Sequence, residues 1–233
     1  MHESRTAAAV TGVFFLVAAV AAVTALALYQ PLLGDPAYVL GPGADRQVLW
    51  GALLEVVLAA AVIGTAVTAY PVVARQGRAL ALGYVCGRLL EAAVIVVGIV
   101  AVLAVVALRQ DGTADGDTSL VAVARGLVAL HDATFLVGPG LVIGVNTLLL
   151  ATLVYRGRLV PRPVAVIGLV GGPLVFLSST AVLFGVYEQV SVWGMLGAIP
   201  VTAWEMSLAV YLVVRGFRRE AAVLPPRSPL VPA

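Results

Sequence analysis

The chain has 233 residues, of which 61% are hydrophobic and 11% are charged; its formal net charge is +2 and its mean hydropathy is +1.06. A soluble domain carries roughly 25% charged residues and 45–50% apolar ones, so this composition excludes an ordinary soluble protein. The apolar residues come in blocks of about twenty or more, the length that a helix needs to cross about 30 Å of hydrocarbon. Transmembrane strands would need short alternating segments instead. We therefore predict an all-α, polytopic membrane protein.

Six membrane-spanning helices are predicted in chain order. The first covers residues 7–29; Ala25-Leu26-Ala27 fits a signal-peptide cleavage site, but the apolar run exceeds the usual core of about 7–15 residues, which favours an uncleaved helix. The other five cover residues 47–73, 79–108, 119–155, 164–186 and 192–214. Together they form a single domain, residues 1–217. The arginine- and proline-rich remainder, residues 218–233, is expected to be a disordered cytoplasmic tail.

Two of these segments contain helix-breaking residues. Residues 119–155 are too many for one straight crossing, so we predict an amphipathic approach followed by a crossing, with a kink at residues 138–140 (Gly138-Pro139-Gly140). Proline causes such kinks because it removes a helix hydrogen bond and clashes one turn back. The fifth helix is expected to be interrupted near Gly171-Gly172-Pro173 for the same reason.

Arginine, the only basic residue besides histidine, predicts the orientation. With the N-terminus inside, the outer loops contain only Arg46 and Arg109, and ten arginines are cytoplasmic. This split satisfies the positive-inside rule, so we predict that both termini are cytoplasmic and that the protein resides in a bacterial cytoplasmic (inner) membrane. The cytoplasmic arginines are Arg5, Arg75, Arg78, Arg156, Arg158, Arg162, Arg215, Arg218, Arg219 and Arg227.

Charged residues also occur inside the apolar segments. Arg88 and Glu91 are three residues apart, so on a helix they share one face and can pair. At about 1.5 Å per residue, Arg88 and Glu205 each lie roughly 15 Å from the cytoplasmic side, and Glu55 lies about 30 Å from it. A histidine and an aspartate follow near the outer boundary. The candidate ligand- or ion-binding residues are therefore Glu55, Arg88, Glu91, His131, Asp132 and Glu205.

A charge at mid-depth costs about 2.5–3.5 kcal/mol on insertion scales, so such residues usually face protein, water or one another. If these faces converge, they line a cleft from the middle of the membrane toward the outside. Negative charges exceed positive ones there, so either some carboxylates are protonated or a cation supplies the balance. The alternative is structural: Arg88 and Glu91 form an ion pair that locks helices, Arg125 and Asp132 belong to a solvated face, and Asn146 donates an interhelical hydrogen bond.

Several chemistries are excluded by the inventory of residues. Cys86 is the only cysteine and His131 the only histidine outside the N-terminal stretch, so neither a disulfide nor a usual zinc site is expected. No phosphate-binding glycine loop or serine elbow is present. We expect no cofactor, no metal and no catalytic residue, and the basic loops are too short to bind nucleic acid.

The chain resembles a bacterial integral-membrane family catalogued as domain of unknown function 4386, over about Arg5 to Phe217. The resemblance implies six helices and a polar set at Glu55, Arg88, Glu91 and Glu205, with His131 and Asp132 as further members, and it implies no activity. Gly172-Pro173 in the fifth helix departs from the family pattern. The resemblance rests on residues 6–16 (TAAAVTGVFFL), 51–55 (GALLE), 81–91 (ALGYVCGRLLE), 155–162 (YRGRLVPR), 204–206 (WEM) and 213–217 (VVRGF).

Three classes of function remain. The first is a transporter-like or sensory bundle that binds a small ligand, a proton or a cation at the buried Glu/Arg cluster. The second is a structural or partner-binding subunit whose buried charges fix helix packing. The third, weaker class is an intramembrane enzyme that uses a carboxylate. The expected partners are the lipid bilayer, a small ligand or cation, and, as a further candidate, a second copy of the chain.

Overall fold

The computed structural model of the protein describes residues 2–35, 37–111 and 118–218. These residues form helices and turns, with no strand among them. Six helices are long and apolar enough to cross a membrane, which confirms the prediction of an all-α, multi-pass membrane protein. The predicted tail lies outside the described residues except for Arg218.

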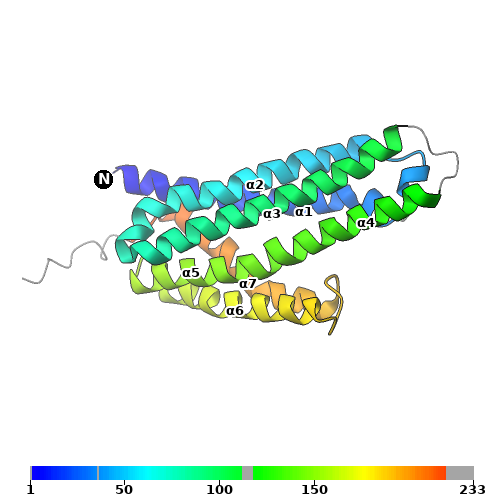
Figure 1. The fold of residues 1–233 in the computed structure, drawn as a ribbon. Helices are drawn as coiled ribbons and strands as arrows, with labels where there is room; N and C mark the ends of the chain where they lie inside the picture. The colour runs from blue at the N-terminus through cyan, green and yellow to red at the C-terminus, as the bar shows by residue number, and fades with distance from the viewer. Residues whose placement is uncertain (1, 36, 112–117, 219–233) are drawn as a thin grey trace, which may run out of the picture.

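The long helices are joined by short turns (Figure 1). The fourth span consists of α4, η3 and α5, which together run from Ser119 to Arg156. The elements in chain order are α1 (His2–Leu33), η1 (Tyr38–Leu40), α2 (Asp45–Val73), η2 (Ala74–Gln76), α3 (Arg78–Gln110), α4 (Thr118–Phe135), η3 (Leu136–Val142), α5 (Ile143–Arg156), α6 (Arg162–Leu183) and α7 (Val192–Val214).

The irregularity in the fourth span is a π-helical segment, η3, which contains Pro139. Proline lacks a backbone N–H and crowds the preceding turn, and a wider π turn is one way for a helix to continue past it. The interruption predicted at Gly171-Gly172-Pro173 is wrong, because α6 is continuous over its 22 residues. Neighbouring helices can support the backbone around a proline in a membrane helix, and both glycines there lie buried against α5 and α7. The helix ends at Leu183, before Gly185, whose φ of 71° is left-handed.

The helices form one elongated bundle. The first three pack side by side, the fourth span packs on α3, α6 packs on α5, and α7 packs on both α6 and α1. Because α3 has 33 residues and α6 has 22, α6 is shorter by about 16 Å at 1.5 Å per residue. Figure 1 shows α1 to α4 extending past the turn between α6 and α7. Among the described elements, α1 to α4 and the short η1 build the end of the bundle opposite the N-terminus.

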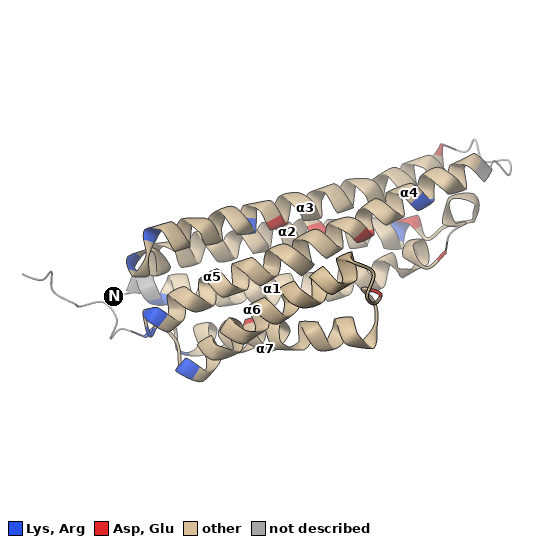
Figure 2. Ribbon diagram, turned by 60° about the horizontal axis from the view of Figure 1, so that its bottom comes forward, with Lys and Arg blue, Asp and Glu red and all other residues tan. Residues whose placement is uncertain are grey.

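Arginines gather at the end of the bundle where α1 begins, whereas carboxylates occupy its middle and the opposite end (Figure 2). This distribution agrees with the orientation expected from the positive-inside rule, in which the arginine-rich end is cytoplasmic.

The crossing of α5 and α6 depends on glycine. A Cβ atom at Gly144 would lie 2.8 Å from both the Gly172 carbonyl oxygen and the Phe176 Cβ atom. By contrast, a Cβ atom at Gly126 on α4 would meet nothing within 4 Å. The chain thus offers a matched pair of helical glycines, one in close contact and one in open space.

We predict that Gly144→Ala lowers the free energy of unfolding by about 1–3 kcal/mol, because an overpacked crossing must separate. Gly126→Ala should leave it unchanged or raise it by up to about 1 kcal/mol, because alanine favours the helix. Thermal unfolding of the two variants and the wild type in one detergent measures both effects. Equal midpoints for the two variants would contradict the assigned crossing.

Candidate functional site

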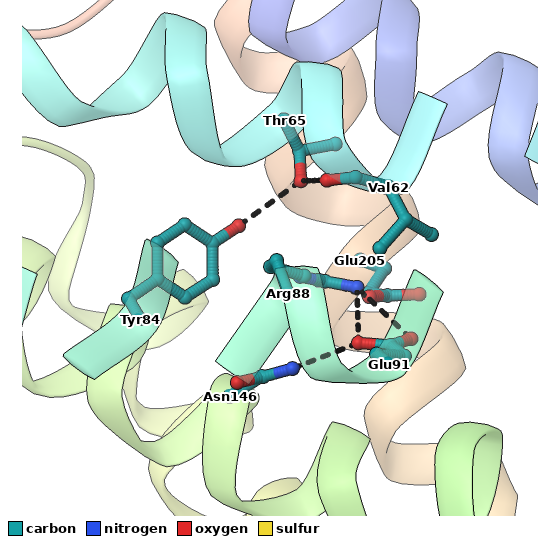
Figure 3. A network of polar contacts seen from close by, with 7 residues as sticks. All are labelled: Val62, Thr65, Tyr84, Arg88, Glu91, Asn146 and Glu205. Atoms are coloured by element: carbon teal, nitrogen blue, oxygen red, sulfur yellow. Dashed lines mark hydrogen bonds and ion pairs between the residues drawn. The ribbon is translucent and has the colours of Figure 1, made fainter. Parts of the chain in front are cut away.

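The centre of the site is a buried arginine in the middle of α3. Arg88 Nη1 donates to both carboxylate oxygens of Glu91, over 3.3 and 3.2 Å, and Nη2 donates to Glu205 Oε1 over 3.0 Å. The side chains of Arg88 and Glu91 are each 4% exposed, and that of Glu205 is 19% exposed. One guanidinium therefore binds a carboxylate of its own helix and a second one from α7 (Figure 3).

Asn146 connects this ion pair to α5. Its Nδ2 donates to Glu91 Oε2 over 2.8 Å, which confirms the expected interhelical hydrogen bond. A side chain at Gly87 would collide with the Asn146 amide, so Gly87 gives α5 its close approach to α3. We call Arg88, Glu91, Asn146 and Glu205 the inner cluster.

Aromatic rings and a threonine extend the inner cluster to α1 and α2. The Arg88 Cζ atom lies 5.4 Å from the ring centre of Phe15 and 5.5 Å from that of Tyr84, within range of cation–π attraction. The hydroxyls of Tyr84 and Thr65 are 3.2 Å apart, and Thr65 donates to the Val62 carbonyl over 2.7 Å (Figure 3). Helices α1, α2, α3, α5 and α7 therefore all contribute to the surroundings of one arginine.

A second polar group lies nearer the opposite end of the bundle. Tyr29 on α1 donates its hydroxyl hydrogen to Glu55 Oε2 on α2 over 3.0 Å. His131 Nε2 on α4 lies 3.9 Å from Glu55 Oε1, and the rings of Tyr29 and His131 meet edge to face with centres 5.5 Å apart. We call Tyr29, Glu55 and His131 the outer cluster.

A cavity of about 170 Å³ connects the two clusters. Its volume resembles that of an engineered cavity of about 150 Å³ that holds benzene, so a small organic ligand fits inside. Three alanines on α1 leave this space open, and the charged residues come from the other helices. The lining residues of α1 are Phe15, Ala18, Ala19, Ala22 and Leu26, and the ionisable lining residues are Glu55, Arg88, Glu91, His131 and Glu205.

Asp132 is the one sequence-predicted candidate that does not line this cavity. Its side chain is 62% exposed and lies 3.4 Å from His131 Nδ1. As the next residue on the helix, Asp132 points about 100° away from His131. It lines a separate pocket together with Arg125, whose side chain is also exposed, in agreement with the solvated face expected for this pair.

The family model described as a domain of unknown function (DUF4386) matches residues 10–216 of the chain. The chain belongs to this family. No curated protein and no solved structure matches it. The candidate site of this DUF4386 member consequently has to be interpreted from its own residues.

Several residues of the two clusters in this DUF4386 member were missed by sequence reasoning. Phe15, Tyr29, Thr65 and Tyr84 occur in apolar segments, where aromatic and hydroxyl residues are common and carry no signal of their position. Their roles depend on which helices are neighbours, and helix order in a bundle does not follow from periodicity. The charged residues were found because a charge in hydrocarbon requires an explanation.

The inner cluster contains polar atoms that its neighbours leave unpaired. Within the described part of the chain, Arg88 Nε and Asn146 Oδ1 are buried and have no hydrogen-bond partner. Buried polar atoms are nearly always paired, so unpaired ones are typical of sites completed by water or a ligand. Among the described residues, no group of three or more His, Cys, Asp or Glu side chains could hold a metal ion.

A third polar group ties together the outer ends of α2 and α3. Arg109 forms an ion pair with Asp45 and donates to the carbonyl oxygens of Gly41 and Pro42. Tyr38 donates to Asp45 Oδ1 over 2.8 Å, and burial together with this hydrogen bond raises the pKa of Tyr38 to about 12. Tyr38 therefore remains a protonated donor at neutral pH. Because this group faces no part of the cavity lining, we assign it to holding the loop before α2.

We predict that Arg88→Met lowers the free energy of unfolding by about 3–5 kcal/mol, because it leaves the buried carboxylates of Glu91 and Glu205 without their cation. Arg125→Met removes an exposed arginine from α4 and should change it by no more than about 0.5 kcal/mol. Chemical denaturation of both variants in the same detergent at neutral pH provides the comparison. An Arg88→Met protein as stable as Arg125→Met would show that Arg88 is not the centre of the packing.

Proposed function

We propose that this protein is an integral protein of a bacterial cytoplasmic membrane that binds a small cationic ligand in the cavity between the two clusters, in a transporter-like or sensory role. The observation that carries the proposal is the balance of charge in the cavity lining. Glu55, Glu91 and Glu205 supply three carboxylates, whereas Arg88 is the only arginine in the lining. One carboxylate is matched by Arg88, and His131 can offset a second only when it is protonated.

The chemistry of the lining favours an organic ammonium ion over a metal ion. Carboxylates accept strong, charge-assisted hydrogen bonds from N–H donors. The three carboxylates do not converge tightly enough to form a metal site within the described residues. The remaining lining is largely apolar, which suits a ligand that carries a short hydrocarbon part. A proton taken up by Glu55 or Glu205 would restore the charge balance in the same way and is the competing cation.

A structural subunit is the second candidate, and the inner cluster is the observation that favours it. The hydrogen bonds of Arg88 and Glu91 join α3 to α5 and α7, as expected of charges that fix helix packing. This role accounts for Arg88 and Glu91 but not for Glu55, which lies in the outer cluster at the other end of an open cavity. In this alternative the partner would be another membrane protein or a second copy of the chain.

We predict that butylammonium chloride raises the thermal unfolding midpoint of the protein in lipid nanodiscs at neutral pH, because a ligand that binds only the folded state stabilises it by mass action. Sodium chloride and sodium butyl sulfate at equal ionic strength should not raise it. Glu55→Gln and Glu205→Gln should each need at least a tenfold higher butylammonium concentration for the same rise in the unfolding midpoint. Glu188→Gln changes an exposed carboxylate in the turn between α6 and α7 and is the matched control.

Three outcomes would contradict the proposal. If butylammonium has no effect beyond that of sodium, the cavity is not an ammonium site. If all three variants respond like the wild type, the ammonium ion binds elsewhere. A midpoint that changes steeply with pH in the wild type and Glu188→Gln, but not in Glu205→Gln, without any response to butylammonium, would identify the proton as the cation.

A further inference from the structure

The wall of the cavity on the α1 side is apolar, and the lining has exposed residues on α1 and α4. Two of its lining residues, Leu26 on α1 and Phe135 on α4, are 41% and 39% exposed. The ionisable lining residues come from α2, α3, α4 and α7. Leu26 and Phe135 are the only exposed residues of the described lining, so the mouth of the cavity is placed between them.

Within the described residues, the lining of the cavity includes no residue of α6 and one residue of α7. The C-terminal part of α7 packs against α1, because a Cβ atom at Gly12 of α1 would meet Ala209 and Val213 of α7. Nearer its start, α7 turns apolar side chains outward, with Trp193 66% and Ile199 57% exposed. Figure 1 shows that α6 and α7 end well before α1 and α4 do. Glu205 is the α7 residue that lines the cavity.

The depth of the mouth places it at the outer edge of the hydrocarbon layer. Leu26 lies 21 residues beyond Arg5 on α1, or about 32 Å from it at 1.5 Å per residue. Phe135 is 21 residues before Arg156, or about 32 Å from the same basic end. Since the hydrocarbon core is about 30 Å thick, the mouth opens toward lipid chains and the outer headgroups.

We propose, building on the cationic ligand of the preceding subsection, that the ligand is an amphiphile that reaches the cavity from the bilayer: its primary ammonium group binds at the carboxylate of Glu55, and its alkyl chain leaves between Leu26 and Phe135. A primary ammonium supplies three hydrogen-bond donors to an acceptor-rich cavity. The cavity holds the head and a few methylene groups, and a longer chain continues into lipid.

The test compares chain lengths at a constant head group. Binding of tritiated dodecylammonium is measured on the protein in phosphatidylcholine nanodiscs, after subtraction of its partition into protein-free discs of the same lipid. Unlabelled butylammonium and dodecyl sulfate are the competitors. In the wild type, dodecylammonium should bind at least tenfold more tightly than butylammonium after that correction, and dodecyl sulfate should not displace it.

A matched pair of variants on α1 tests the mouth. Leu26→Trp places an indole where the chain leaves, whereas Val23→Trp adds the same group at a position that is 72% exposed and does not line the cavity. The ratio of dodecylammonium to butylammonium affinity should fall at least fivefold in Leu26→Trp and remain at the wild-type value in Val23→Trp, which should also leave butylammonium affinity unchanged.

Three results would overturn the inference, and they differ in whether they also overturn the cation site proposed above. Equal corrected affinities for the two amines in the wild type would refute the lateral mouth and leave the cation site in place. Displacement by dodecyl sulfate would show a groove for lipid chains without selectivity for a cationic head. Binding of neither amine would remove the proposed cation site as well.

Discussion

A single guanidinium buried in apolar helices is the constraint on which this structure depends. Arg88 must find negative charge, because an unpaired charge at this depth is costly. It is paired with Glu91 on its own helix and with Glu205 on α7, and Phe15 and Tyr84 cover its face. Glu91 alone supplies one full counter-charge to Arg88, and Glu205 adds a second carboxylate at the point where α7 passes the cluster.

The fourth span contributes residues to both clusters, one from each side of its π-helical segment. His131 on α4 belongs to the outer cluster and Asn146 on α5 to the inner one, and the π-helical segment lies between them. A π turn changes the rotation between the two halves of a helix, so η3 sets which faces of α4 and α5 point inward. Its position next to the cavity, where Pro139 is a lining residue, agrees with the frequent occurrence of π segments at functional sites.

The sequence predicts those residues of the site that carry a charge inside an apolar segment. Arg88, Glu91 and Glu205 were recognised because charges inside apolar segments need partners, and the spacing of Arg88 and Glu91 identified their pairing. The partner of Glu55 could not be predicted, because Tyr29 is 26 residues away on another helix and nothing in the sequence indicates that α1 and α2 meet there. The continuity of α6 through Pro173 was predicted wrongly, because the contacts that support it come from α5 and α7.

The central claim is that the carboxylate of Glu205 exceeds what the packing needs and is retained for a ligand. The free energy of unfolding of ligand-free Glu205→Gln, compared with the wild type in one detergent at neutral pH, tests this claim most directly. Because Glu91 still neutralises Arg88 in the variant, we expect it to be as stable as the wild type or more stable, as is common when a functional charge is removed. A loss of about 3–5 kcal/mol, the effect of breaking a buried structural ion pair, would contradict the claim and identify the cluster as scaffolding.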